Sequence, residues 1–383
     1  MDSDSRKQTA HGKEPTKRVL FSHEGTDYLV VWRMDTTPSG LERYLVRPRT
    51  RGHVGPPMEV EVVPSRAPEW ARLRLKEEAE LASRLMHPAI ERVLGLHQRG
   101  EKHFLLKEHV DGCSLASAIS FGVLRGDRWL SEAFCLYMAS AVAEALHAAH
   151  TAADEGGQPL GIIHRAVNPC GVRIGWDGSV KLGDFASAYS LLPQRLRTPK
   201  GLFRGEIEYA APERLVEPRT AVPDTRMDLF SLGVVLLEAL TGNCLYGLAS
   251  LEAAAGLVRW RPVPRRMVRA ERPSWATLGE MAALAAALRP EHVEEALHGV
   301  SEPVKNIVHE VLRRDPGERY ATAADFRSDL QACLRAMREQ PYGSRAASLE
   351  LLQARTEAEG SPLREEVSLT ERGVFPEDIP RYS

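Results

Sequence analysis

Apolar residues in the first third of the chain fall into short runs whose composition favours β-strands. The runs cover residues 28–32, 43–46, 58–63, 90–96 and 103–107. Turn-forming Pro38-Ser39-Gly40 and Gly55-Pro56-Pro57 separate the first three. A stretch with helical spacing of apolar residues, 68–86, lies between the third and fourth runs. The pattern predicts an antiparallel sheet with one helix.

After Asp111-Gly112 the pattern becomes helical. A helix is expected over 131–151, with Ser131 as its N-cap. Two short strands, 172–174 and 180–182, are joined by a hairpin turn at Asp177-Gly178. Helices dominate from residue 228 to about 337. A small strand-rich unit is therefore followed by a larger helical one.

Composition narrows the class of protein. The chain has 383 residues, 43% of them hydrophobic, and a formal net charge of -2, so neither nucleic acid nor an anionic membrane is an expected partner. Five scattered cysteines without metal spacing indicate reduced thiols. The N-terminus is polar and the most apolar stretch, 229–240, is too short to span a bilayer, so we expect a cytoplasmic protein.

Both ends of the chain are polar. Residues 1–17 are expected to form a disordered tail. Residues 341–383 are expected to form a flexible C-terminal tail, in which a short helix over 346–358 is an open alternative.

Five motifs in order carry a family resemblance. They are His164-Arg165-Ala166-Val167-Asn168-Pro169, Lys181-Leu182-Gly183-Asp184-Phe185-Ala186, Tyr209-Ala210-Ala211-Pro212-Glu213, Asp228-Leu229-Phe230-Ser231-Leu232-Gly233 and Arg314-Asp315-Pro316 through Arg319-Tyr320. Together they resemble bacterial, eukaryotic-like Ser/Thr protein kinases, and the insertion 157–161 is similar to the myxobacterial type. The resemblance implies an α+β, bilobal kinase-like fold, with a small antiparallel β-sheet N-lobe (18–110) and a larger helical C-lobe (111–340).

The residues that hold the fold in this family are present. The resemblance implies that Glu213 pairs with Arg319 and that Asp228 holds the backbone of the catalytic loop. It also implies that His164 and Phe185 belong to the apolar stack between the lobes. Arg165 occupies the arginine position of the catalytic loop, and Glu78 matches the helix glutamate that normally pairs with the β3 lysine.

The residues that transfer phosphate are largely absent. Ala166 replaces the catalytic aspartate, Asn168 the lysine that touches the phosphate, and Gly171 a metal-binding asparagine. Asp184 keeps the position of the second metal ligand, and could be a residual metal site or a relic.

The nucleotide-binding strands also depart from the family. The preferred alignment places the glycine-rich loop over 36–42 with Gly40 as its one glycine, and puts Glu61 at the β3 lysine. A rival alignment uses Gly25 as the loop glycine and Arg47 in place of the lysine.

Charged residues then fill the adenine pocket. Lys107 matches the gatekeeper, Arg173 the apolar residue beneath adenine and Glu59 the small residue above it. Because buried charges require partners, we expect Lys107 to pair with Glu61 or Glu78, and Arg173 to reach Glu59.

The resulting interpretation is a pseudokinase that regulates or scaffolds a protein partner, such as an active kinase, without a cofactor. A Ser/Thr kinase with residual activity, which would use ATP and Mg²⁺, is the first alternative. A kinase fold that uses nucleotide for other transfer chemistry is the second.

Overall fold

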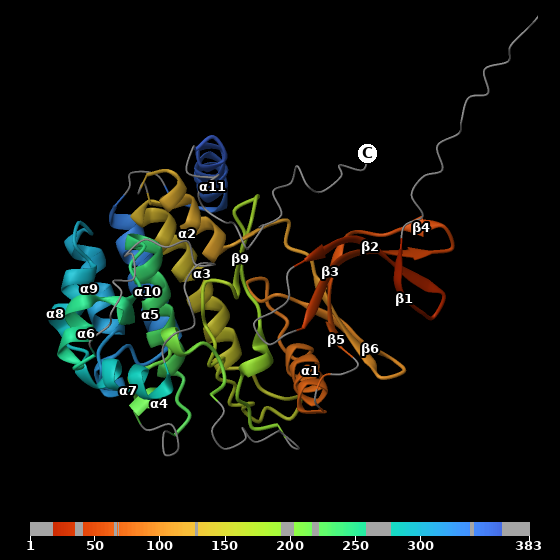
Figure 1. The fold of residues 1–383 in the computed structure, drawn as a ribbon, viewed down its shortest axis with the longest axis horizontal. Helices are drawn as coiled ribbons and strands as arrows, with labels where there is room; N and C mark the ends of the chain where they lie inside the picture. The colour runs from red at the N-terminus through yellow and green to blue at the C-terminus, as the bar shows by residue number, and fades with distance from the viewer. Residues whose placement is uncertain are drawn as a thin grey trace, which may run out of the picture.

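The computed structural model describes residues 18–34, 41–64, 67, 69–126, 129–192, 203–216, 222–257, 277–337 and 341–361. Within these residues a strand-rich lobe and a helical lobe stand side by side (Figure 1). The predicted fold class is confirmed. Among the described residues no helix is long and apolar enough to cross a membrane.

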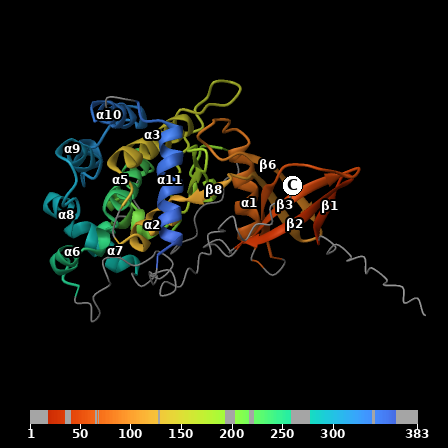
Figure 2. The ribbon, with the colours of Figure 1, turned by 90° about the horizontal axis from the view of Figure 1, so that it is seen from above.

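The N-lobe is one antiparallel sheet with a single helix. Its elements are β1 (Val19–His23), β2 (Thr26–Met34), β3 (Glu42–Thr50), β4 (His53–Val54), β5 (Met58–Val63), α1 (Glu69–Ala82), β6 (Val93–Arg99) and β7 (Lys102–Glu108). The strand order is β1-β2-β3-β5-β7-β6, with β4 paired to β3. Figure 2 shows α1 beside this sheet.

The strand pairing decides between the two alignments. β2 pairs directly with β3, and β5 lies between β3 and β7 and leads into α1. This strand order agrees with the preferred alignment, which puts Glu61 on the strand before the helix. The rival is wrong because Arg47 lies on β3, one strand away, and its Nε donates to the carbonyl of Gly55 at 2.8 Å. Gly40 lies outside the described residues.

The strand β1 was not predicted from the sequence. Its Phe21 stacks on Tyr28 and Phe104, with ring centroids 4.2 and 4.1 Å apart. These rings cover the face of the sheet opposite to α1, whose Leu75 packs with Val63 on the other face. Aromatic pairs of this kind stabilise a fold by about 0.5–1.5 kcal/mol each, in addition to the free energy of burying their surface. These contacts hold β1 against the rest of the sheet.

The C-lobe begins after β7. Its elements are β8 (Gly112–Ser114), α2 (Leu115–Leu124), α3 (Glu132–His150), β9 (Val172–Gly175), β10 (Val180–Leu182), η1 (Phe185–Ser187), η2 (Ile207–Tyr209), α4 (Pro212–Val216), α5 (Arg226–Thr241), η3 (Leu245–Gly247), α6 (Ala249–Ala254), α7 (Leu278–Ala287), α8 (Pro290–Ala296), α9 (Glu302–Val311), η5 (Pro316–Glu318), α10 (Ala323–Ala336) and α11 (Ser344–Glu359). As predicted, Ser131 caps α3 and accepts a hydrogen bond from the backbone N–H of Phe134 at 3.1 Å.

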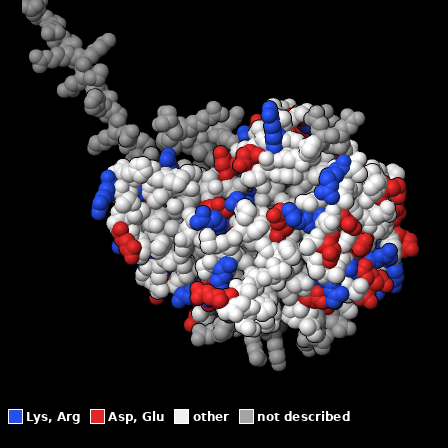
Figure 3. Space-filling model, turned by 180° about the vertical axis from the view of Figure 1, so that it is seen from behind, with Lys and Arg blue, Asp and Glu red and all other residues white. Residues whose placement is uncertain are grey.

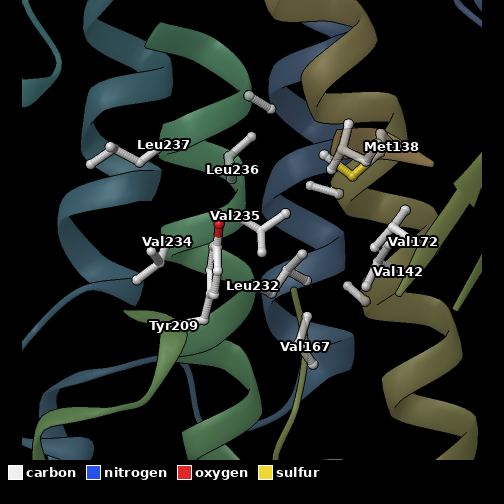
Figure 4. Packing of buried hydrophobic residues seen from close by; sticks show 14 of the residues in the cluster. Met138, Val142, Val167, Val172, Tyr209, Leu232, Val234, Val235, Leu236 and Leu237 are labelled. Carbon is white, nitrogen blue, oxygen red and sulfur yellow. The ribbon is translucent and has the colours of Figure 1, made fainter. Parts of the chain in front are cut away.

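Helix α5 is the centre of the C-lobe core. Its residues from Met227 to Leu240 are all buried, as expected of a helix surrounded by others. Figure 4 shows Leu232 and Val235 of α5 on the side that faces Met138 and Val142 of α3. This core supports the catalytic-loop segment on one side of the interlobe cleft.

The prediction of a flexible tail from residue 341 is wrong for 344–359, where the open alternative of a short helix is correct. Helix α11 packs against α2 and α3 (Figures 1 and 2). It buries small residues, Ala347, Ala354 and Ala358, together with Leu351. Alanine gives a weak hydrophobic signal, which is why the sequence pattern missed this contact. Residues 1–17 and 362–383 lie outside the described part of the chain.

Candidate functional site

The catalytic-loop backbone is held by one buried carboxylate. Asp228 accepts hydrogen bonds from the backbone N–H groups of His164 and Arg165, both at 2.7 Å. It also bonds to Nε2 of His150 at 2.9 Å. Burial raises the pKa of Asp228, but His150 and these hydrogen bonds outweigh it, and the net pKa lies below the ordinary value. The predicted role of Asp228 is confirmed.

The other fold-holding pairs are also in place. The rings of His164 and Phe185 meet edge to face, with centroids 4.5 Å apart. Glu213 and Arg319 form a two-point ion pair at 2.9 and 2.8 Å, and the Arg319 guanidinium lies over the Phe230 ring. Bidentate pairs of this kind are both strong and geometrically specific.

The position of the missing catalytic aspartate is a buried methyl group. Ala166 is 6% exposed. The activation-segment residue Gly205 lies against it, so that a Cβ atom placed on Gly205 would come within 3.2 Å of the Ala166 Cβ. A carboxylate at position 166 would therefore lie against the backbone at Gly205. It would also lack the other catalytic groups, which Asn168 and Gly171 replace.

Asn168 does not point into the cleft as a phosphate-contacting lysine would. Its Nδ2 donates to the carbonyl of Ala166 at 2.9 Å, and its Oδ1 accepts from the backbone N–H groups of Cys170 at 2.8 Å and Gly171 at 3.1 Å. The side chain is 3% exposed and serves the loop itself. Gly171 has no side chain to hold a metal ion.

The predicted pairing of Lys107 is confirmed, with both candidate partners at once. Its Nζ lies 3.0 Å from Oε1 of Glu61 on β5 and 2.8 Å from Oε1 of Glu78 on α1. Burial lowers the pKa of Lys107, but the two carboxylates outweigh it and raise the pKa well above its ordinary value. Burial raises the pKa of Glu78 to about 7, because Lys107 offsets the effect of burial only in part and the negative charge of Glu61 adds to it.

A second ion-pair group joins the two lobes. Glu59 of β5 accepts from Nη2 of Arg173 on β9 at 2.9 Å, as predicted, and from Nη2 of Arg43 on β3 at 2.8 Å. Its Oε1 also lies 3.2 Å from Nδ1 of His109, which follows β7. Burial raises the pKa of Glu59, but Arg173, His109 and Arg43 outweigh it and hold the pKa well below its ordinary value.

Three further members of this cluster had only weak signals in the sequence. Arg43 and His109 were missed, although strand alternation places His109 on the same face as Lys107. Glu91 was also missed; it is 8% exposed, and burial raises its pKa despite the nearby Lys107. The sequence signal for Glu91 was that it is an acidic residue within an apolar run.

The candidate metal ligand that remains from the family pattern is Asp184. Asp184 is exposed and has a left-handed backbone, with φ of 61°. In the described part of the chain there is no group of three or more His, Cys, Asp or Glu side chains that could hold a metal ion. Gly171 offers no side chain as a second metal ligand, and the Arg173–Glu59 ion pair joins β9 to β5 at 2.9 Å.

Comparison with known proteins places these motifs in a family. The family model described as "Protein kinase domain" matches residues 61–330, which is more than half of the chain. The tyrosine-protein kinase MasK of Myxococcus xanthus is 30% identical over 204 residues, 53% of this chain and 29% of that protein. The serine/threonine-protein kinase PknB of Mycobacterium leprae is 27% identical over 266 residues, 67% of this chain and 35% of that protein.

These matches cover about a third of the length of each relative. Among solved structures, the kinase domain of Mycobacterium tuberculosis PknI aligns with a TM-score of 0.48 and 21% identity, over 82% of this chain and 97% of that one. On the extent of the family match, with the catalytic-loop, activation-segment and large-lobe motifs in their places, this chain belongs to the protein kinase domain family.

Proposed function

We propose that this chain is a pseudokinase, a cytoplasmic protein of kinase fold that neither binds MgATP nor transfers phosphate and acts by contacting a protein partner. The observation that carries the proposal is the 2.9 Å contact between Arg173 and Glu59. By their place in the family, these residues form the floor and the roof of the adenine pocket. A purine between them needs about 7 Å, two layers of van der Waals contact.

Electrostatics also oppose a triphosphate. In an active kinase the β3 lysine neutralises phosphate charge. Here Glu61 occupies that position, and the ammonium of Lys107 beside it already pairs with both Glu61 and Glu78. At ~4 Å and an effective dielectric near 20, one charge pair is worth roughly 4 kcal/mol. Exchanging an attraction for a repulsion would weaken ATP binding by several tenfold steps.

The chemical step lacks its proton acceptor. Ala166 cannot orient or deprotonate a substrate hydroxyl, a contribution typically worth about 10²–10⁴-fold in rate. The family match begins at residue 61, so β2, β3 and the segment between them lie outside it. The replacement of the β3 lysine by Glu61 therefore affects nucleotide binding, and the replacement of the catalytic aspartate by Ala166 affects the chemical step.

The retained features favour a role in protein contacts. The Lys107–Glu78 pair holds α1 against the sheet without nucleotide, and Asp228 and the Glu213–Arg319 pair keep the C-lobe in order. Figure 3 shows basic and acidic side chains interspersed on one face, which fits a protein partner better than nucleic acid. An active kinase or another signalling protein is the partner class that we propose.

Phosphotransfer assays test the proposal. The full chain, incubated with Mg²⁺ and γ-labelled ATP, should label neither itself nor a generic protein substrate, and Ala166→Asp should not restore labelling. Label from the γ-phosphate that Asp184→Ala abolishes would support the residual kinase instead. In a parallel reaction with α-labelled ATP, label on the protein would support nucleotidyl transfer.

A genetic test addresses the regulatory role. Replacing the gene by an Asp184→Ala allele should leave the cellular phenotype of the wild type, whereas deletion should change it. An Asp184→Ala phenotype equal to that of the deletion, with normal protein abundance, would contradict a role without catalysis.

A further inference from the structure

The hairpin of β9 and β10 connects the C-lobe to the N-lobe. Arg173 of β9 donates to Glu59 of β5 at 2.9 Å, and Nζ of Lys181 on β10 lies 2.6 Å from Oε1 of Glu108 at the end of β7. A backbone bridge also joins β10 to the segment before β6. The position of this hairpin therefore sets whether the interlobe ion pairs can form.

Helix α11 holds the opposite end of the same hairpin. The Ser348 hydroxyl donates to the carbonyl of Trp176 at 2.6 Å, and the Arg355 guanidinium lies 4.9 Å from the centroid of the Trp176 ring. Gly178, at the turn, has φ of 81°, and a Cβ atom placed on it would collide with the carbonyl oxygen of Ser344. The first turn of α11 thus packs directly on the hairpin turn.

Helix α11 is itself fixed to the rest of the C-lobe. Glu350 accepts from the backbone N–H of Ser131 at 2.6 Å and from its hydroxyl at 2.8 Å, at the start of α3. Arg125, after α2, pairs with Glu357 at 2.7 Å. In Figure 2, α11 runs alongside α2. One rigid helix therefore joins α2 and α3 to the hairpin turn.

We propose that α11 is an intramolecular strap that holds the β9–β10 hairpin in position and thereby keeps the Arg173–Glu59 contact closed. The strap lies beyond residue 330, where the family match ends, so it is a feature of this chain rather than of the matched domain. Release of α11 from the hairpin would then allow the Arg173–Glu59 contact to open, and binding of α11 to the hairpin would keep it closed. This inference concerns how the lobes are held, and stands whether or not the cleft binds nucleotide.

Hydrogen exchange of the full chain, read by mass spectrometry, tests the strap. The double variant Ser348→Ala/Arg355→Ala removes both contacts to Trp176. The matched control is Leu349→Ala, because this residue of the same helix is 62% exposed. One hydrogen bond and one cation–π contact correspond to a change of roughly 5- to 30-fold. Exchange should increase by that factor in residues 172–182 and in β5, and Leu349→Ala should change neither.

A double-variant cycle separates a strap from ordinary packing. Distant substitutions normally have additive effects, so coupling between α11 and Arg173 would have to pass through the hairpin. Arg173→Ala should raise exchange in β5 of the wild type and add little in the strap variant. Exchange in β5 within twofold of wild type in the strap variant, or additive effects, would overturn the proposal. If α11 itself detaches, shown by exchange over 344–359, β5 should still open; protection of β5 in that case would equally refute the strap.

Discussion

Replacing Lys107 with methionine would leave two buried carboxylates without their counter-ion. Methionine keeps most of the side-chain volume, so the change is chiefly one of charge. The side chains of Lys107 and Glu78 are 4% and 2% exposed, and that of Glu61 is 12% exposed. The variant therefore tests whether the lysine is the electrostatic centre of the N-lobe side of the cleft.

Two arguments set the expected loss in the free energy of unfolding of Lys107→Met. Removing one partner of a buried ion pair typically costs about 3–5 kcal/mol. The cost is limited because a carboxylate can bind a proton instead, which at pH 7 costs about 4 kcal/mol for a group of ordinary pKa. The pKa of Glu78 is already raised to about 7, so binding a proton costs this carboxylate little at that pH. We expect a loss of about 3–4 kcal/mol at pH 7.5.

Urea denaturation followed by tryptophan fluorescence measures this loss. The penalty should shrink by roughly 1.4 kcal/mol for each unit of pH below 7, because the abandoned carboxylate is then protonated more easily. Glu61→Gln should restore most of the stability of Lys107→Met. Lys102→Met, an exposed substitution on the same strand, should stay within about 0.5 kcal/mol of wild type. A Lys107→Met loss below about 1 kcal/mol at pH 7.5, or an equal loss at pH 5, would refute the reasoning.

Two further substitutions test the buried carboxylates. Because burial raises the pKa of Glu78 from 4.5 to about 7, its contribution to stability is complete below pH 4.5 and is lost as the pH rises to 7. Glu78→Gln should remove that decline, roughly 1–3 kcal/mol, from a pH series of urea titrations, and an unchanged slope would contradict the assignment. Asp228→Asn should lower stability by about 2–4 kcal/mol in the same assay, because an amide N–H would face a backbone N–H. A loss below 0.5 kcal/mol would be inconsistent with the contacts at Asp228.

The sequence was informative where several residues act together in a fixed order. The catalytic-loop, activation-segment and α5 motifs occur in the order and spacing of the kinase family, and this resemblance implied the fold and the roles of Asp228, Glu213 and Arg319. The pairing of Lys107 and Arg173 followed from the rule that buried charges need partners. The sequence left two alignments open at Glu61, and the order of the strands before α1 distinguishes them.

Other features depended on contacts between distant segments. Arg43 contacts Glu59 from β3 and His109 contacts it from the segment after β7. These residues are far apart in the sequence, so their contact leaves no local sequence pattern. Strand β1 packs through aromatic stacking on residues far along the chain. Helix α11 buries mainly alanines, whose small side chains give a weak hydrophobic signal, so its packing against the C-lobe was not recognised from the sequence.

Calorimetric titration of the full chain with MgATP tests the central claim most directly. The Arg173–Glu59 contact bridges the adenine position and the charge around Lys107 is already balanced by acid, so no saturable heat should appear up to about 1 mM, a binding free energy weaker than about -4 kcal/mol. The pair of substitutions Glu59→Ala and Arg173→Ala, which clears that position, serves as the comparison. Saturable binding of MgATP to the wild type with a micromolar Kd would contradict the account.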